Sequence, residues 1–506
     1  MSKCLWSALR AGILIGFFVI GCSAPTGQAT PPASPAPPTA RAALVEYRRI
    51  GDAGAGADSA DLALNWRPVN PGHAARGGWS SSVWLASLPD GETKRRYILD
   101  CTGCHQLNET RVFRGDSLRT AVQWSTDAAR MIAFAGSESG FPVISHDADA
   151  ESLGAFLSSH LRAAPPANAA ATYEALVAPP PRDSDALRAR ITEYQLPVAP
   201  DLPHDVAVTA DGSVLVTGMF TSRIYRVNPD SGVVGVENIP VEKANPRAIE
   251  LDAAGNWWVL CGAPMKVARY EPAGARWTSW DIGMYPHSIA PSSDGSRIWF
   301  NGHFTRDPEQ IGWLDPATGQ VTTATAPRHP ELGAQPGGPI PYEARLAPNG
   351  TLWVSELQGN RLLGHHPGTG AWKTWSMPTS WSGPRRFDVG PDGVLWIPAY
   401  ANGTLVRFDP STGAVEELPL PIADSVPYVV RVDPRNGQVW IGTAAADVLY
   451  RYSPAERRFD ILPIPTRGAS MRHLAVDPAR GAVWVAYGAS PAIHPARVAR
   501  IQILPD

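Results

Sequence analysis

The sequence carries little charge and almost no imbalance of charge. Charged residues make up 18% of the 506 residues, and the formal net charge is −3. There is neither a basic stripe nor a nucleic-acid-binding motif, which excludes nucleic acid as a partner. The sequence also has no nucleophile triad, phosphate-binding loop or quinone-cofactor signature, so none of those chemistries is indicated.

Cysteine is scarce, and the five cysteines form no disulfide pattern. Cys4 and Cys22 lie near the amino terminus, Cys101 and Cys104 are three apart, and Cys261 lies alone in an apolar, strand-like run. A lone cysteine in such a run is expected to be a small buried hydrophobic residue. No disulfide framework is therefore predicted.

The apolar run near the amino terminus is short. It covers residues 12–21 and cannot span a membrane as a stable helix, but it follows a positively charged start, as a secretion signal does. The run ends in Val19-Ile20-Gly21-Cys22, which resembles the lipobox of bacterial lipoproteins. This resemblance implies that residues 1–21 are a removed signal peptide and that Cys22 is lipidated. The alternatives are an ordinary signal peptide or a transmembrane stub.

Residues 22–41 are rich in proline and alanine and are expected to form an extended tether. Two acyl chains on Cys22 would anchor the protein stably, and this anchor would be its only contact with a membrane. Ser23 follows the cysteine, which by analogy directs a lipoprotein to the outer membrane. The expected location is extracytoplasmic, at the periplasmic face of the outer membrane.

One short stretch, Cys101-Thr102-Gly103-Cys104-His105, dictates a specific chemistry. Two cysteines three apart can each bond to one vinyl group of a haem, and the adjacent histidine can reach the iron from one face. This is the C-x-x-C-H attachment signature of c-type cytochromes. A zinc site would need further ligands at matching spacing, which are not evident, and a thioredoxin-like site would need a strand before the helix. The motif predicts one haem c bound by Cys101, Cys104 and His105.

The flanks of this motif predict helices. One precedes the motif from about Asp90, a second covers about residues 117–132, and a third begins near residues 147–149 with an apolar stripe. This layout resembles a small class I cytochrome c over residues 89–165. The resemblance implies that Met131 is the distal iron ligand, and a thioether there would suit electron transfer. The alternatives are that His146 or His160 is the ligand, or that there is none.

Self-similarity begins near residue 190 and continues to the end of the chain. A Pro-led strand, a Gly-containing turn and a Trp-containing strand recur roughly every 40 to 55 residues. The copies begin at Pro203, Pro246, Pro286, Pro341, Pro384, Pro427 and Met471. A unit of this length with four strands is one propeller blade, so the repeats predict a seven-bladed propeller of four-stranded blades. The last copy lacks its outer strand, and strand 191–197 is expected to complete it.

The repeats resemble the virginiamycin B lyase (streptogramin lyase) family over residues 190–506. That family opens a cyclic depsipeptide by Mg²⁺-dependent elimination, with a histidine in an inner strand and a glutamate later in the same blade. Here the pair is broken: His204 is followed by Gly218, and Glu356 is preceded by Tyr342. The weak catalytic candidates are therefore His204, His287, Glu356 and His473, and Mg²⁺ is expected only if the chain is a lyase.

The residues that follow the repeated proline are expected to line one end of the central channel. They could bind a small polar or anionic ligand, or they could be structural residues that satisfy each other. These channel candidates are His204, Arg247, His287, Tyr342, Glu343, Arg385, Arg386, Tyr428 and His473.

Together these features predict a multidomain protein, in which a small all-α cytochrome c domain is followed by an all-β propeller. The expected segments are the signal peptide 1–21, the tether 22–41, an unassigned extension 42–88, the haem domain 89–165, a linker 166–189 and the propeller 190–506. The expected function is electron transfer to or from a partner protein, with the propeller binding a small polar substrate or the redox partner. The alternatives are a Mg²⁺-dependent lyase with an appended cytochrome, and a non-catalytic propeller that docks a redox partner.

Overall fold

The computed structural model describes residues 36–50, 67–68, 78–198, 200–305, 307–333, 335, 338–488 and 496–505. The chain divides into two units, Met1–Pro37 and Pro38–Asp506, and every described helix and strand lies in the second. The predicted signal peptide and the lipidation site Cys22 lie outside the described residues.

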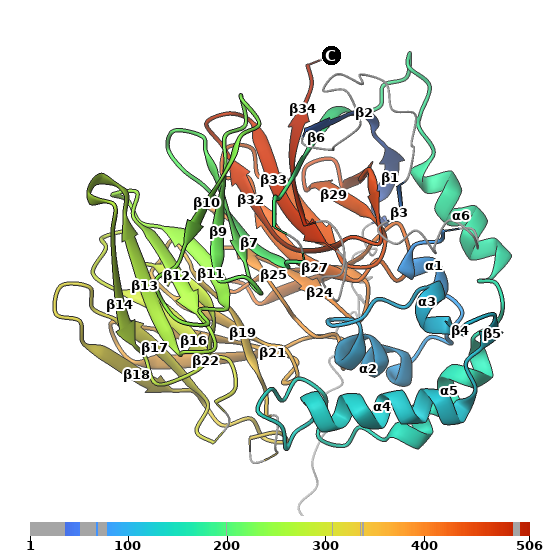
Figure 1. Ribbon diagram of the computed structural model, residues 1–506, viewed down its shortest axis with the longest axis horizontal. Helices are drawn as coiled ribbons and strands as arrows, with labels where there is room; N and C mark the ends of the chain where they lie inside the picture. The colour runs from blue at the N-terminus through green and yellow to red at the C-terminus, as the bar shows by residue number, and fades with distance from the viewer. Residues whose placement is uncertain are drawn as a thin grey trace, which may run out of the picture. The chain divides into compact units, whose positions relative to one another are not determined.

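Seven β-sheets form the seven blades of a propeller, as the repeats predict (Figure 1). The inner strands of successive blades contact each other around a ring, and β32 of the last blade contacts β7 of the first. The first four blades each have four antiparallel strands. They are β7 (Pro203–Val208), β8 (Val214–Gly218), β9 (Arg223–Val227) and β10 (Val234–Asn238); β11 (Pro246–Leu251), β12 (Trp257–Cys261), β13 (Lys266–Glu271) and β14 (Arg276–Asp281); β15 (Pro286–Pro291), β16 (Ile298–Gly302), β17 (Gln310–Leu314) and β18 (Val321–Thr325); and β19 (Pro341–Leu346), β20 (Leu352–Glu356), β21 (Arg361–His366) and β22 (Ala371–Ser376).

The last three blades depart from a uniform pattern. Blade five begins with a two-residue inner strand, and blades six and seven each have a fifth strand. Their strands are β23 (Asp388–Val389), β24 (Leu395–Ala399), β25 (Thr404–Asp409) and β26 (Ala414–Pro419); β27 (Pro427–Val432), β28 (Val439–Thr443), β29 (Val448–Ser453), β30 (Arg458–Pro463) and β1 (Thr39–Ala42); and β32 (Ser470–Asp477), β33 (Ala482–Gly488), β34 (Arg497–Ile503), β6 (Arg188–Gln195) and β2 (Leu44–Ile50).

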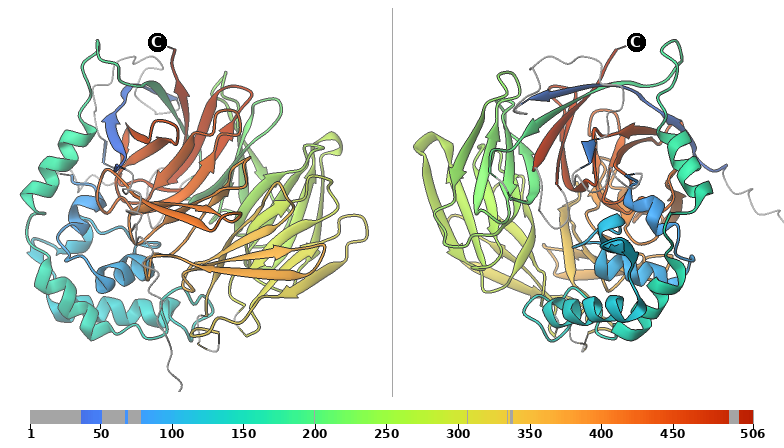
Figure 2. Two further views of the ribbon diagram at one scale, coloured as in Figure 1. Left: turned by 180° about the vertical axis from the view of Figure 1, so that it is seen from behind. Right: turned by 45° about the vertical axis from the view of Figure 1, so that its right-hand side comes forward.

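The seventh blade is completed by a strand that precedes the first blade, as predicted. β6 pairs antiparallel with β34, with Ile191 opposite Ile501. The prediction of four-stranded blades throughout is wrong, because β1 pairs parallel with β30 and β2 pairs parallel with β6 (Figure 2). An outer strand exposes unpaired backbone groups, and the amino-terminal strands satisfy them in these two blades.

Tight turns join the first two strands of several blades and explain the recurring glycine. Gly212, Gly350 and Gly393 have φ values of 87°, 81° and 80°. A residue with a Cβ rarely adopts this backbone conformation, so glycine is favoured at these positions. Each turn brings a fully buried second strand back beside the inner strand.

The helices lie between β2 and β6 in the sequence. They are α1 (Ser81–Leu85), α2 (Glu92–Cys101), α3 (Glu109–Val112), α4 (Ala121–Ala135), α5 (Ala150–His160) and α6 (Ala167–Val177). Short two-stranded ribbons accompany them and the last blades: β4 (Phe113–Arg114) with β5 (Ser117–Leu118), and β3 (Arg67–Pro68) with β31 (Thr466–Arg467). A 3₁₀ turn, η2 (Pro272–Gly274), lies in blade two. Of the described helices, none is long and apolar enough to cross a membrane.

Helix α4 starts later than expected because residues 117–118 are the strand β5. Its start is set by a capping box, in which the Thr120 side chain accepts from the Gln123 backbone N–H and the Gln123 side chain accepts from the Thr120 N–H. Helix α5 is capped by Asp149, which accepts from the N–H of Ser152.

The predicted all-α domain is the main error about the fold. The described chain is mostly β, its six α-helices are short, and their buried side chains belong to two core clusters that also contain propeller residues. In one of these clusters Ile98 and Leu99 of α2 lie with the propeller residues Leu357, Tyr400 and Tyr428. The apolar stripes of the helices were correct indications of burial, but a stripe does not reveal which surface will cover it.

Candidate functional site

The C-x-x-C-H motif forms the turn at the end of α2. The N–H groups of Cys104 and His105 both donate to the carbonyl of Cys101, over 3.2 and 3.0 Å, and Thr102 Oγ1 donates to the carbonyl of Ile98 over 2.7 Å. These bonds keep Cys101 and His105 close together in space. Cys101, Cys104 and His105 are all half-buried.

Cys101 and His105 line a cavity of about 420 Å³, and Met131 of α4 lines it too. Such a volume is in the range of cofactor and small-molecule sites. His146 and His160, the alternative ligands, are not among the lining residues: His146 is exposed, and the ring of His160 lies 5.1 Å from that of Phe156.

The His105 ring is held in its neutral form. The pKa of His105 is lowered to about 4, mainly by burial and to a lesser extent by the charges of Arg111 and Arg130. Arg111 Nη2 donates to His105 Nδ1 over 3.0 Å. A neutral imidazole is the form that binds a metal ion.

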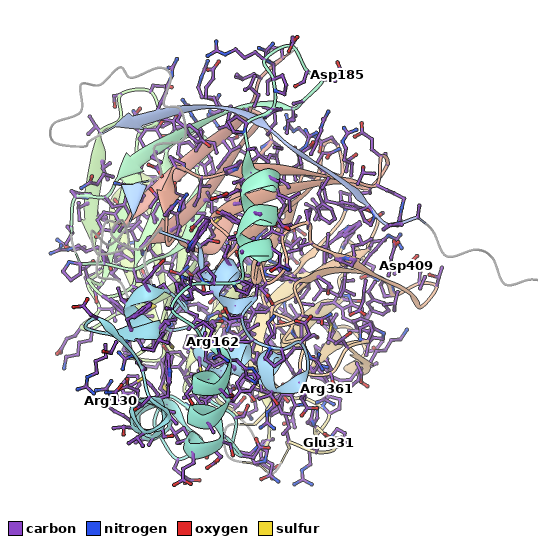
Figure 3. All side chains as sticks on the ribbon, turned by 90° about the vertical axis from the view of Figure 1, so that its right-hand side faces the viewer. Arg130, Arg162, Asp185, Glu331, Arg361 and Asp409 are labelled. Atoms are coloured by element: carbon purple, nitrogen blue, oxygen red, sulfur yellow. The ribbon has the colours of Figure 1, made fainter. Side chains whose placement is uncertain are left out.

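The wall of the cavity suits a large, flat, apolar group that carries carboxylates. Apolar side chains form one part, among them Trp124, Leu153 and Leu157. Arginines form another part: Arg119 and Arg130 share the carboxylate of Asp127, over 2.5 and 3.1 Å (Figure 3 labels Arg130). Arginine binds carboxylates well, and a haem carries two. The thiol of Cys101, a neutral imidazole, a thioether and a wall of apolar side chains and arginines line this cavity and fit a haem c, whereas Cys104 is not among the lining residues.

The propeller channel holds a second group of polar residues. All nine channel candidates are buried. His204 Nδ1 and Asp205 Oδ1 are hydrogen-bonded over 2.8 Å. Arg386 forms a two-point ion pair with the Asp205 carboxylate, in which its Nη2 and Nη1 lie 2.9 and 3.1 Å from the two oxygens. Fork-like arginine–carboxylate pairs of this kind are among the strongest polar contacts in proteins.

A second acid, Glu343, is likewise surrounded by arginines. Arg431 and Arg345 approach its Oε1 to 3.0 and 3.1 Å, and Arg345 also pairs with Glu250 over 2.9 Å. Arg431 Nη2 lies 2.6 Å from His473 Nε2. The candidates Arg386 and Glu343 are therefore paired with charged neighbours in the channel, which favours the structural alternative for these two residues.

Three channel histidines are neutral. His287 Nδ1–H donates to the carbonyl of Tyr342 over 3.0 Å, and His303 Nδ1–H donates to that of Pro341 over 2.9 Å. Burial is the main cause that lowers the pKa of His303 to about 3 and those of His204 and His287 well below the usual value. Their rings are close, with centroids 5.4 Å apart for His204 and His287 and 4.6 Å apart for His287 and His303.

The lyase-type pair of histidine and glutamate is not assembled. Glu356 is fully buried and paired with Arg361 over 2.6 Å, beside Glu309, rather than with a candidate histidine. Burial raises the pKa of Glu356. Within the described part of the chain, no group of three or more histidine, cysteine, aspartate or glutamate residues could hold a metal ion.

The motif loop rests directly on one end of the channel. We call the propeller residues beneath it the axial cluster: Tyr342, Arg385, Tyr400, Tyr428 and Arg472. Thr102 Oγ1 and Tyr400 Oη are hydrogen-bonded over 2.8 Å, and Arg472 Nη2 donates to the carbonyl of Gly103 over 2.6 Å. Gln106 Nε2 donates to the carbonyls of Ala444 and Ala469 over 2.6 and 3.0 Å.

Sequence reasoning missed Tyr400 and Arg472 in this cluster. Arg472 follows Met471, the start of the seventh repeat, so strict alignment of the repeats would have placed it in the channel ring. Tyr400 follows the second strand of blade five, and no repeated pattern marks that position.

Comparison with known proteins supports the fold. No protein-family model matches the chain, and no curated protein matches it. Among solved structures, virginiamycin B lyase from Staphylococcus aureus is 19% identical, with a TM-score of 0.54 over 62% of this chain and 100% of that chain. A streptogramin B lyase structure is 20% identical, with a TM-score of 0.54 over 62% and 98% of the two chains. The WD40 repeats of RRP9 are 10% identical, with a TM-score of 0.51 over 62% and 97%.

These likenesses establish the class of protein, a seven-bladed β-propeller. The predicted resemblance to the fold of the virginiamycin B lyases is confirmed. Since all three identities are 20% or lower, they show the fold and not an activity.

Proposed function

We propose that the chain is a haem c protein that transfers electrons. The haem is bound covalently by Cys101 and Cys104, and its iron by His105 and Met131. The observation that supports this most is that Met131 of α4 lines the same cavity of about 420 Å³ as Cys101 and His105 of the motif.

A haem bound there supplies a one-electron couple, whose potential a thioether ligand raises. The protein's own residues hold and shield it. Trp124, Leu153 and Leu157 provide an apolar wall that excludes water, and Arg119 and Arg130 provide cations for the carboxylates.

The propeller serves this haem as a rigid support and as a docking body for a redox partner. The channel candidates Arg386 and Glu343 are already paired with charged neighbours, which favours a partner protein over a small substrate at that depth of the channel. Residues 1–22 carry the secretion signal and the lipidated Cys22, so the protein is anchored outside the cytoplasm, where haem c is attached.

The lyase alternative is not favoured by any contact. Glu356 is paired with Arg361, and the candidate histidines lie in another hydrogen-bonding network. One related lyase structure contains quinupristin. We expect no Mg²⁺-dependent opening of that compound by this protein.

The test of the proposed function is the visible spectrum of the purified protein, oxidised and reduced, with denaturing gels stained for covalent haem. Haem should be attached in the natural protein and absent from the double variant C101S/C104S. Met131→Ala should lose the sulfur–iron charge-transfer band, while the control variants His146→Ala and His160→Ala should keep it. A natural protein without covalent haem would falsify the proposal.

A further inference from the structure

The axial cluster brings two guanidinium groups against the haem-attachment loop. Arg472 donates to the carbonyl of Gly103, and a Cβ built on Gly103 would lie 2.9 Å from Arg385 Nη2. Both arginines are buried, with 4% of Arg385 and 8% of Arg472 exposed. The loop they touch holds the two cysteines of the motif.

Arg385 is enclosed by aromatic rings instead of acids. Its guanidinium carbon lies 3.7 Å from the ring centroid of Tyr400 and 4.6 Å from that of Tyr428, and its Nη1 donates to Tyr342 Oη over 2.9 Å. Among the described carboxylates, none forms an ion pair with Arg385. Its neighbour Arg386 differs, because it pairs with both oxygens of Asp205.

A buried cation without an acid keeps most of its field, because little water and no counter-charge screen it. An electron added to a nearby redox group is stabilised by that field, so a positive charge favours the reduced state. Net charge and burial around a haem are among the main determinants of its potential.

On the basis of the proposed function, we propose that Arg385 and Arg472 of the propeller are positioning residues. They hold the attachment loop in place and raise the reduction potential of the haem. Tyr342, Tyr400 and Tyr428 hold Arg385 in place through their ring faces and a hydroxyl group. The propeller is then part of the redox centre and not an independent appended domain.

The experiment is a spectroelectrochemical titration of the full-length protein and its variants. Arg385→Gln should lower the equilibrium constant for haem reduction by about tenfold, which is about 59 mV for a one-electron couple. Arg472→Gln should change it in the same direction. Arg385→Lys keeps the charge and should restore most of the natural potential.

The matched control is Arg297→Gln. Arg297 also stacks on aromatic rings, those of Trp299 and Trp313, but it lies in blade three, and none of its contacts with described residues involves the motif. Its variant should keep the natural potential. A purely structural role of the axial arginines would change stability and leave the potential unaltered.

The outcomes separate the two proposals. Haem-loaded Arg385→Gln and Arg472→Gln proteins with the natural potential overturn the tuning role alone. A natural protein without covalent haem overturns both proposals. If Arg385→Gln does not fold, the reduction potential of Arg472→Gln tests the tuning role instead, because this substitution removes a charge at the same loop.

Discussion

Gly103 shows how closely the motif and the propeller are fitted at the scale of one residue. The site accommodates the hydrogen side chain of glycine but leaves little space for a methyl group, since an added Cβ would lie 2.9 Å from Arg385 Nη2. The guanidinium cannot move aside freely because Tyr400 and Tyr428 pack against it. The propeller therefore constrains this residue of the C-x-x-C-H motif.

Gly103→Ala should lower the free energy of unfolding by about 1 to 3 kcal/mol, the usual range for overpacking a buried contact. Equilibrium denaturation measures this change. Gly140→Ala is the control, because a Cβ there would meet nothing within 4 Å. Equal effects of the two substitutions would contradict the close contact.

Tyr428 has an unusual acidity. Burial raises the pKa of its phenol, but the guanidinium groups of Arg472, Arg385 and Arg386 outweigh burial and lower it to about 8. The hydroxyl also shares a hydrogen bond with Tyr342.

Ultraviolet titration should show a phenolate that forms near pH 8, below the ordinary tyrosine range, and Tyr428→Phe should remove it. Because the folded pKa lies below the unfolded value, Tyr428 binds fewer protons in the folded state between about pH 8 and 10. The natural protein should therefore gain stability relative to Tyr428→Phe as pH rises through this window, and lose this gain as pH falls below about 8. Parallel pH profiles of the two proteins would contradict this prediction.

At the scale of elements, β6 is the strand on which closure of the ring depends. It lies between β34 and β2 and is bonded to both, although it precedes the whole first blade in the sequence. The repeats predicted this strand because its sequence completes the pattern of the seventh copy. They did not predict β1 and β2, because an added edge strand belongs to no repeat.

Ile191→Pro in the middle of β6 should cost about 3 kcal/mol or more, since proline removes a backbone N–H from a strand that is paired on both sides. Thermal and denaturant unfolding measure the loss. Ala40→Pro in the outermost strand β1 is the control and should cost less than about 1 kcal/mol, because Ala40 is exposed and β1 is paired on one side only. The idea of a closing strand fails if both substitutions are equally mild.

At the scale of the whole molecule, the helices and the propeller are joined by buried polar contacts as well as by a shared core. Lys94 of α2 pairs with Asp424 over 2.8 Å, and Gln358 Nε2 donates to Asp100 Oδ1 over 3.1 Å. Tyr173 Oη of α6 donates to the carbonyl of Ala446 over 3.1 Å. Helices as short as these derive most of their stability from such packing.

We therefore expect the helices and the propeller to unfold in a single cooperative transition. Calorimetry should give one peak, and far-UV circular dichroism and the absorption of the proposed haem should change at the same temperature. Lys94→Met should lower that temperature without splitting the peak. Two well-separated transitions would show that the helices form an independent domain.

The sequence by itself determined the number of blades, the closing strand and the C-x-x-C-H motif. Each is a pattern of residue types at short, regular spacing, and such spacing sets local structure directly. It also placed Met131 correctly on a helix, since the apolar periodicity of α4 is local too.

Only the tertiary structure determined which propeller residues the motif contacts. The contacts of Gly103 and Thr102 with Arg472 and Tyr400 join residues about 300 to 370 positions apart. They depend on how the helix faces pack against a channel that exists only after seven blades have closed. No local pattern specifies such a contact. The C-x-x-C-H motif is recognisable from the sequence alone, but its contacts with the propeller form only in the folded molecule.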